Sequence, residues 1–207
     1  STFGCFRSLI RAAVFSAARR QLPAPLGARL PLGSLIYDRS ASGGIGSAGD
    51  TDSFTVTLDA GQTVSVLVTP SSATLTSSVE LRDPNNVALG SATAAAAGAK
   101  VILQTLTAAT AGIYAVVVSG AGNSLGAYSV GLTLNAALET EGINGPTNDT
   151  ITAAQNLDNS SVVIGGRAAR LAVLGMTSGG TKIIAAENFE SGAFPASFTK
   201  YSFNKSG

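Results

Sequence analysis

Apolar and polar residues alternate along the stretch from Gly49 to Thr69. Apolar side chains occupy every second position from 54 to 58, and the alternation resumes from 64 to 68 after a turn-forming break at 59–62. A period of two on both sides of a break is typical of two antiparallel strands that each bury one face. The pattern predicts a β-hairpin, to which the later strands of the chain are added.

Short segments of similar character continue to residue 135. An Asp-Pro-Asn-Asn sequence at 83–86 predicts a sharp turn, because proline fixes φ and asparagine tolerates the left-handed conformation. The segments 38–49 and 90–99 are rich in glycine, serine or alanine and are predicted as loops. Strands are predicted at 35–37, 78–82, 87–89, 100–106, 127–135 and 113–119, the last being apolar nearly throughout and therefore central. This spacing predicts an all-β fold, an antiparallel jelly-roll-like β-sandwich.

The first 34 residues are interpreted as a basic arm followed by a linker. Residues 3–20 place apolar side chains at helical spacing with arginines off that stripe, which indicates an amphipathic helix. Such a helix suits a membrane-surface anchor, a targeting segment or a contact with a partner subunit. A strand is the alternative, because 11–17 resembles 170–176. Residues 21–34 contain three prolines and predict an extended linker.

Composition narrows the classes of function. The chain has 207 residues, with no histidine and one cysteine, Cys5. The lack of histidine excludes His-based catalysis, and with a single cysteine it also excludes the usual zinc sites. The formal net charge of +1 gives no field that attracts nucleic acid. Five arginines and no acid lie in residues 1–37, so residues 38–207 carry eight basic and 12 acidic residues, a net charge of −4. No apolar run approaches the roughly 20 residues that span a bilayer. We therefore predict a protein that is not an enzyme, binds no nucleic acid and has no membrane span.

Five ordered elements resemble the bacterial pre-peptidase C-terminal domain family. They are GDTDSF at 49–54, DAGQTV at 59–64, LRDPNN at 81–86, LTAATAGIYAVVV at 106–118 and GAYSVGL at 126–132. The resemblance implies a compact jelly-roll-like sandwich over residues 35–136 that is secreted or on the cell surface. It also implies a non-catalytic module, similar to the collagen-binding domains of secreted proteases and appended to enzymes or arranged in tandem. Some such modules bind calcium at their opening segment.

Residues 137–207 are interpreted as a linker and an incomplete second β module. The segment 138–157 resembles the opening of another such module, and 187–207 resembles the first strand of a lectin-like or concanavalin-like sandwich. The apolar strands expected between them lack the partners of a complete fold; they are 162–164, 171–174 and 183–184. The sequence therefore predicts a fragment, or a subunit that a neighbour completes.

Calcium is the one cofactor for which the residues argue. Ca²⁺ takes about six to eight oxygen ligands, and one loop after the sandwich is rich in carboxylate and amide oxygens. The predicted metal ligands are Glu139, Glu141, Asn144, Asn148 and Asp149, with Asp50 and Asp52 approaching the same ion from the sandwich. A solvated linker that uses Asn and Asp in its turns is the alternative interpretation.

These observations predict a non-catalytic extracellular module of a larger bacterial surface protein, acting in adhesion, spacing or assembly. Its expected partners are neighbouring modules or subunits of the same protein, including further copies in an oligomer. One alternative is a structural subunit of a filament or surface layer, in which 167–186 or the N-terminal arm adds a strand to a neighbour's sheet. Another is an accessory fragment of a secreted hydrolase.

Overall fold

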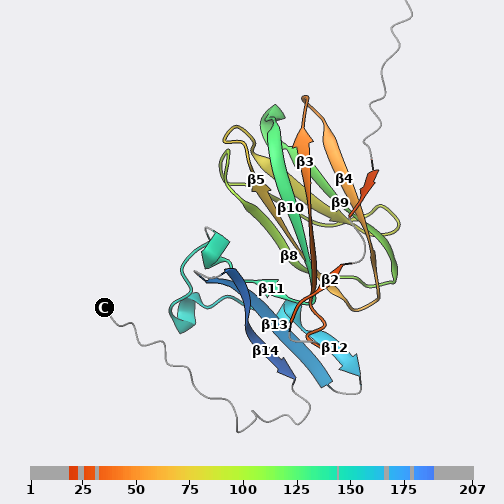
Figure 1. Cartoon of the computed structure of the whole chain (residues 1–207), viewed down its shortest axis with the longest axis vertical. Helices are drawn as coiled ribbons and strands as arrows, with labels where there is room; N and C mark the ends of the chain where they lie inside the picture. Colours follow the sequence, from red (N-terminus) through yellow and green to blue (C-terminus); the bar gives the residue numbers. More distant parts are fainter. Residues whose placement is uncertain are drawn as a thin grey trace, which may run out of the picture.

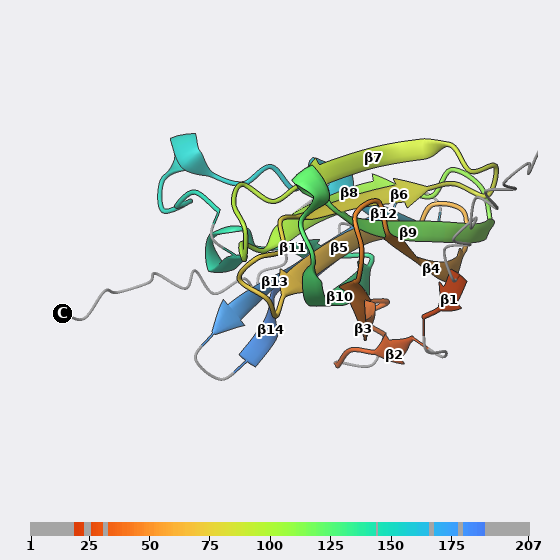
Figure 2. The same cartoon turned by 90° about the horizontal axis from the view of Figure 1, so that it is seen from above.

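Two five-stranded sheets face each other in the computed structural model and form a β-sandwich (Figure 1). The structure describes residues 19–22, 26–30, 33–143, 145–165, 168–177 and 180–188. The first sheet has the order β1 (Arg19–Gln21), β4 (Thr51–Leu58), β9 (Gly112–Gly120), β6 (Ser77–Arg82) and β7 (Ala88–Thr93). The second has the order β2 (Gly27–Ala28), β3 (Tyr37–Ile45), β10 (Gly126–Leu134), β5 (Thr63–Pro70) and β8 (Val101–Thr107). Seen from above, β6, β7 and β9 lie in one layer and β3, β5 and β10 in the other (Figure 2).

A third, four-stranded sheet lies at one end of the sandwich (Figure 1). It has the order β11 (Ala137–Leu138), β13 (Ala168–Thr177) and β12 (Val162–Gly165), with β14 (Gly180–Asn188) also paired to β13. Short 3-10 helices connect the strands: η1 (Ala121–Asn123), η2 (Glu141–Ile143), η3 (Ile151–Ala153) and η4 (Asp158–Ser160). We call the third sheet the C-terminal sheet.

The main core lies between the two sheets of the sandwich. Alternate residues of β4 and of most of β10 are buried in this core, as expected of half-buried strands. Tyr114, Tyr128 and Phe54 are the largest fully buried side chains. The rings of Phe54 and Tyr128 meet edge to face at 6.4 Å, a favourable geometry for aromatic pairs. The predicted antiparallel β-sandwich is thus confirmed, and β9 is central in its sheet as predicted.

The predicted hairpin at 49–69 is wrong. Both of its strands exist, but β4 pairs with β1 and β9, whereas β5 pairs with β10 and β8 in the opposite sheet. The break at 59–62 therefore carries the chain from one sheet to the other. Alternation reports only which face of a strand is buried, and two strands that face each other across a core show the same pattern as two neighbours.

The predicted loop at 38–49 is also wrong, because β3 runs through most of it and pairs with β10. Its glycines conceal the strand. A Cβ on Gly43 would lie 2.4 Å from the Tyr128 hydroxyl oxygen, so the tyrosine needs a glycine opposite it. The short strand predicted at 35–37 begins only at Tyr37, since Leu35 has a positive φ of 54°.

The hairpin of β6 and β7 is confirmed, with its turn at 83–86. Asp83 organises the turn: its carbonyl accepts from the Asn86 amide, and its carboxylate accepts from the amides of Asn85 and Val87. Asn86 takes the positive φ that the turn requires. β7 continues to Thr93, so the first part of the loop predicted at 90–99 is strand instead.

The described part of the N-terminal arm joins both sheets. β1 pairs with β4 in parallel, β2 pairs with β3, and Leu22 is buried in the main core. Within the predicted linker over 21–34, Gln21, Gly27 and Ala28 therefore pair with strands of the sandwich. Of the helix predicted over 3–20, the last two residues lie in β1, and the rest lies outside the described residues, as does Cys5. The domain boundaries at 34 and 136 stay a prediction.

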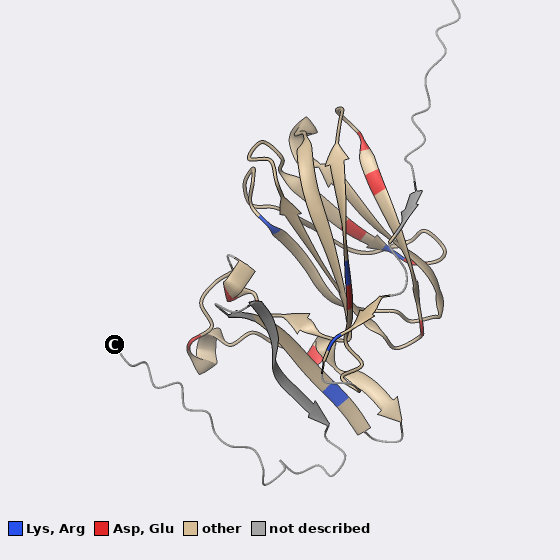
Figure 3. Cartoon of the chain, in the orientation of Figure 1, with Lys and Arg blue, Asp and Glu red and all other residues tan. Residues whose placement is uncertain are grey.

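The strands predicted after residue 160 exist as β12, β13 and β14, and they pair with one another and with β11. The segment from 189 to 207 lies outside the described residues. Charged residues are scattered over the described strands (Figure 3). No helix in the described part of the chain is long and apolar enough to cross a membrane.

Candidate functional site

The C-terminal sheet is joined to the sandwich through a second apolar cluster. Its buried members are Ile36, Ala136, Leu138, Ile143, Ala172 and Leu174, and Leu67 and Ile102 pack against them from the outer face of the sandwich. The cluster is separate from the main core, because the inner face of each strand already packs within the sandwich. We call this junction the seam.

Asn135 forms the polar centre of the seam. Its backbone amide donates to the Thr63 carbonyl at 2.8 Å, and its side-chain oxygen accepts from the Thr63 backbone amide at 3.2 Å. Its side-chain nitrogen donates to the Leu35 carbonyl at 2.8 Å. One asparagine thereby ties together the starts of β3 and β5 and the chain that leaves the sandwich.

Residues 135–143 lead from the end of β10 toward the C-terminal sheet, and we call them the connection. Its residues after Asn135 are hydrogen-bonded in the same way. The Ser65 hydroxyl donates to the Ala136 carbonyl at 2.8 Å, and the Leu138 amide donates to the side-chain oxygen of Gln104 at 2.9 Å. Gln155 then donates to the Leu138 carbonyl at 2.9 Å. Because these bonds are at least partly buried, replacing them by water is unfavourable.

Three residues near the seam have a left-handed backbone conformation, which is strained for Leu35 and Thr105 and tolerated by Asn135. Leu35, Thr105 and Asn135 have φ values of 54°, 57° and 61°, a region that residues other than glycine rarely adopt. Thr105 belongs to a β-bulge, where the pairing of β5 with β8 shifts between Val64 and Val66. β-bulges re-aim side chains, and Gln104 in this bulge reaches the connection. Backbone strain of this kind is concentrated at functional sites, which favours the seam as one.

The C-terminal sheet contacts the connection and the N-terminal part of the sandwich directly. The Glu139 amide donates to the Leu174 carbonyl at 2.8 Å, and the Arg170 guanidinium donates to the Gly33 carbonyl at 2.9 Å. Partial burial lowers the pKa of the Arg170 guanidinium, because burial disfavours its charged form. The seam therefore joins three stretches of the chain that are far apart in sequence.

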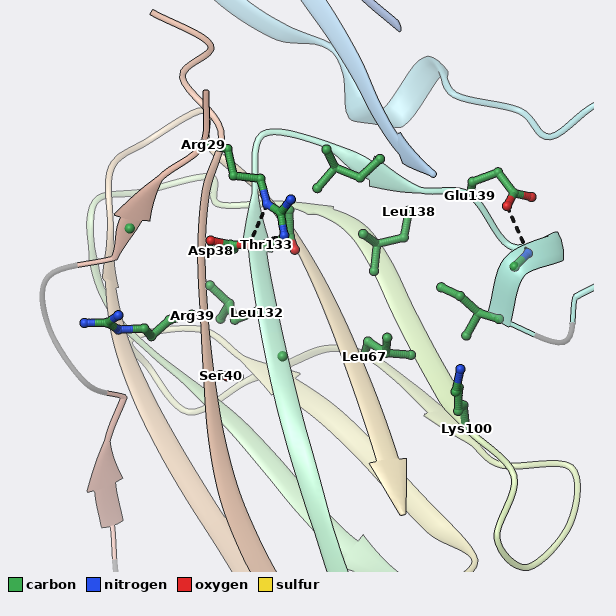
Figure 4. Close-up of a pocket in the computed structure, with 15 residues that line it drawn as sticks. Arg29, Asp38, Arg39, Ser40, Leu67, Lys100, Leu132, Thr133, Leu138 and Glu139 are labelled. Atoms are coloured by element: carbon green, nitrogen blue, oxygen red, sulfur yellow. Dashed lines mark hydrogen bonds and ion pairs between the residues drawn. The ribbon is translucent and has the colours of Figure 1, made fainter. Parts of the chain in front are cut away.

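A cavity of about 420 Å³ opens beside the seam (Figure 4). Its apolar lining includes Leu67, Leu138, Ile143 and Leu174. Its charged lining comes from the ion pair of Arg29 and Asp38 and from Arg39, Lys100 and Glu139. The cavity thus lies between the outer face of the sandwich and residues 138–143, which follow β10.

Three of the predicted calcium ligands lie together beside this cavity. The Glu139 carboxylate accepts from the amides of Glu141 and Gly142 at 2.6 and 2.9 Å and from the Asn148 side chain at 3.3 Å. The Glu141 carboxylate accepts from the Asn148 amide at 3.5 Å. Asp149 follows in the same loop. The Glu139 carboxylate therefore caps the first residues of η2, and the Glu141 carboxylate binds the loop that follows.

Asp50 and Asp52 lie at the opposite end of β3. The Gly46 amide donates to Asp50 at 2.9 Å and the Gly44 amide to Asp52 at 3.1 Å, both near the end of β3. Glu139 follows β10, whose last residue pairs with the first of β3. Nine strand residues span roughly 26 Å at about 3.3 Å each. The structure therefore does not bring Asp50 and Asp52 to the other predicted ligands, and Asn144 lies outside the described residues.

Asp52 instead connects the two sheets. It is 8% exposed, and its carboxylate accepts from the Tyr128 hydroxyl at 2.7 Å as well as from the Gly44 amide. Asp52 belongs to β4, whereas Tyr128 and Gly44 belong to the other sheet. Among the described residues no group of three or more His, Cys, Asp or Glu is placed to hold a metal ion.

The residues that form the seam are not predicted from the sequence. Asn135, Ser65 and Gln104 are scattered over three strands or strand ends. Asn135 and Ser65 each stand between two apolar residues, but so do many surface residues of a half-buried strand, so this pattern does not single them out. A buried polar side chain needs hydrogen-bond partners, and here those partners come from distant parts of the chain.

The sequence matches no family model and no curated protein. Similar solved structures include PliG of Aeromonas hydrophila, a periplasmic inhibitor of g-type lysozyme, with 16% identity, a TM-score of 0.36, and coverage of 56% of this chain and 99% of that chain. PliG of Salmonella Typhimurium has 20% identity, a TM-score of 0.37, and coverage of 57% and 99%. The pre-peptidase C-terminal domain of a Bacillus anthracis collagenase has 17% identity, a TM-score of 0.37, and coverage of 56% and 94%. These similarities assign the chain to no family, and the β-sandwich follows from its own sheets.

Proposed function

We propose that this chain is a non-catalytic β-sandwich module that works outside the cytoplasm as a spacer, holding the unit that follows it at a fixed angle. The observation that carries this proposal is the seam. A flexible tether between modules needs neither a buried apolar cluster nor strained residues. A fixed joint needs packed side chains across the junction and a backbone held in one conformation, and the seam has both. The Ser- and Thr-rich strands and the resemblance to secreted modules support the extracellular setting.

The hydrogen bonds of the connection support a fixed joint. Asn135, Ser65 and Gln104 each bond to a different part of the backbone, so that the connection cannot turn without breaking several bonds. A typical internal hydrogen bond contributes about 1 kcal/mol to stability. Strand exchange between copies has less support, because β1 and β14 each pair within the chain.

Double electron–electron resonance, which measures the distance between two spin labels, tests the fixed joint. Nitroxide labels at Asp59→Cys on the sandwich and Val163→Cys on the C-terminal sheet, both exposed positions, are expected to give one narrow distance distribution. Cys5→Ser removes the native thiol. The control pair, Asp59→Cys with Asn85→Cys, lies within the sandwich and sets the width for a rigid body. A seam distribution much broader than that of the control pair would show a flexible tether and contradict the proposal.

Calcium binding stays a proposal, confined to Glu139, Glu141 and Asn148. Two carboxylates and one amide offer five oxygen atoms, so water or another chain must complete the six to eight ligands that calcium takes. If calcium binds there, millimolar CaCl₂ raises the Tm of the full chain by a few degrees, because a ligand of the native state stabilises it. Glu141→Gln is expected to abolish this rise, and Asp50→Asn to leave it unchanged. A Tm that does not respond to CaCl₂ leaves this group as a helix cap.

A further inference from the structure

The cavity beside the seam has an apolar wall made of aliphatic side chains. Leu67 comes from the outer face of β5, Leu138 and Ile143 from the connection, and Leu174 from β13. No aromatic residue is among the residues that line it, so it lacks the flat surface on which sugar rings stack. Its volume of about 420 Å³ lies within the roughly 300–1,000 Å³ of small-molecule pockets. The wall suits a flexible aliphatic chain.

Three cationic residues line the cavity, and two of them, Arg29 and Arg39, already have interaction partners. Asp38 forms an ion pair with Arg29, and the Glu139 carboxylate is turned to the backbone of η2. Lys100 stands at the rim, and in Figure 4 its ammonium end points toward the cavity on the side of Leu67. Within the part of the chain that the structure describes, no hydrogen bond or ion pair of Lys100 is found. An anionic group of a ligand in the cavity would be attracted to this ammonium.

We propose that this cavity binds an aliphatic monocarboxylate of medium chain length. The alkyl chain packs on Leu67, Leu138 and Leu174, and the carboxylate pairs with Lys100. Each buried methylene adds about 0.8 kcal/mol to binding, so a chain of several methylenes is needed to outweigh the loss of translational freedom. This inference goes beyond the proposed function, because a rigid joint needs no ligand.

Gly131 offers a way to close the cavity without disturbing the fold. It lines the cavity from β10, between Val130 and Leu132, whose side chains are buried in the main core. A Cβ at Gly131 would point to the outer face and meet only the Leu67 carbonyl oxygen, at 3.8 Å. Gly131→Val therefore fills the cavity with a side chain that also suits a strand.

Isothermal titration calorimetry of the full chain with sodium octanoate, below the critical micelle concentration of octanoate, tests the proposal by measuring the Kd. We expect one site per chain, with a Kd at least tenfold higher in Lys100→Met and in Gly131→Val. The matched control is Gly44→Val, an exposed glycine of β3 that does not line the cavity and whose Cβ would have ordinary contacts at 3.8 Å. Its Kd is expected to stay within about twofold of the original, and an unchanged Tm shows that each variant is folded.

Three results would overturn the inference. The absence of binding heat with the original chain removes the site. Equal affinity of the original chain and Gly131→Val places the ligand elsewhere. A Kd for 1-octanol as low as that for octanoate removes the role of the carboxylate and of Lys100. None of these results bears on the label distances across the seam, so the failure of this inference and of the spacer function are distinguishable.

Discussion

Replacement of Leu174 by alanine is expected to lower the free energy of unfolding of the C-terminal sheet by about 3 kcal/mol, the usual effect of removing a buried leucine. Leu174 is 2% exposed and belongs to the apolar cluster of the seam. Its loss leaves a space beside Leu138 and Ile143 that the surrounding strands fill only in part. The joint should then open more often than the sandwich unfolds.

Hydrogen exchange measures this effect locally. In Leu174→Ala the amides of β11 and β13 should exchange on the order of a hundredfold faster, as about 3 kcal/mol implies, while the amides of the central strand β9 keep their protection. The control is Leu125→Ala, a leucine that is 39% exposed and whose loss should change stability by less than about 0.5 kcal/mol. Equal exchange in the two variants would show that the apolar cluster does not hold the joint.

Replacement of Asp52 by alanine is expected to destabilise the whole sandwich by about 3 kcal/mol. The buried carboxylate accepts from Tyr128 and Gly44, and a hydrogen bond to a charged group contributes about 1.5–3 kcal/mol. Both donors lie in the opposite sheet, so the change loosens the two sheets at this edge. Urea denaturation followed by circular dichroism measures the loss.

Asp50→Ala is the matched control for this change. Asp50 also accepts from a backbone amide, but its bond is exposed to solvent, so we expect a loss below about 1 kcal/mol. A double-mutant cycle of Asp52→Ala with Tyr128→Phe should give a coupling energy of about 1–2 kcal/mol. If the two single changes add without coupling, the hydrogen bond between the sheets does not stabilise the fold.

The sequence predicts where the strands of this fold lie along the chain better than it predicts which strands pair with each other. Alternation located β4, β5 and β10 because burial on one face leaves a period of two whichever strand lies beside them. It could not show that β4 and β5 face each other across the core. β3 was hidden because its glycines and serines look like a loop, and the reason for Gly43 is the Tyr128 side chain that lies against it.

In the candidate site, too, contacts between residues close in sequence can be predicted, whereas contacts between distant residues cannot. Glu139, Glu141 and Asn148 are close in sequence and meet in one turn, so their grouping could be predicted. Asp50 and Asp52, which the same prediction brings to the ion from the sandwich, are separated from this group by the length of β3. The seam depends on contacts such as Asn135 with Leu35, 100 residues apart, which no local pattern reports.

The pairing of β3 with β10 has a consequence for synthesis on the ribosome. Ile45 pairs with Gly126, so β3 leaves the ribosome before its long partner β10, by roughly 4–16 s at about 5–20 residues per second. An unpaired strand rich in Val and Ile would be prone to aggregate during that interval. The serines and glycines of β3 give it low hydrophobicity and weak β-propensity. We therefore expect β3 to resist aggregation in the nascent chain until β10 is synthesised and pairs with it.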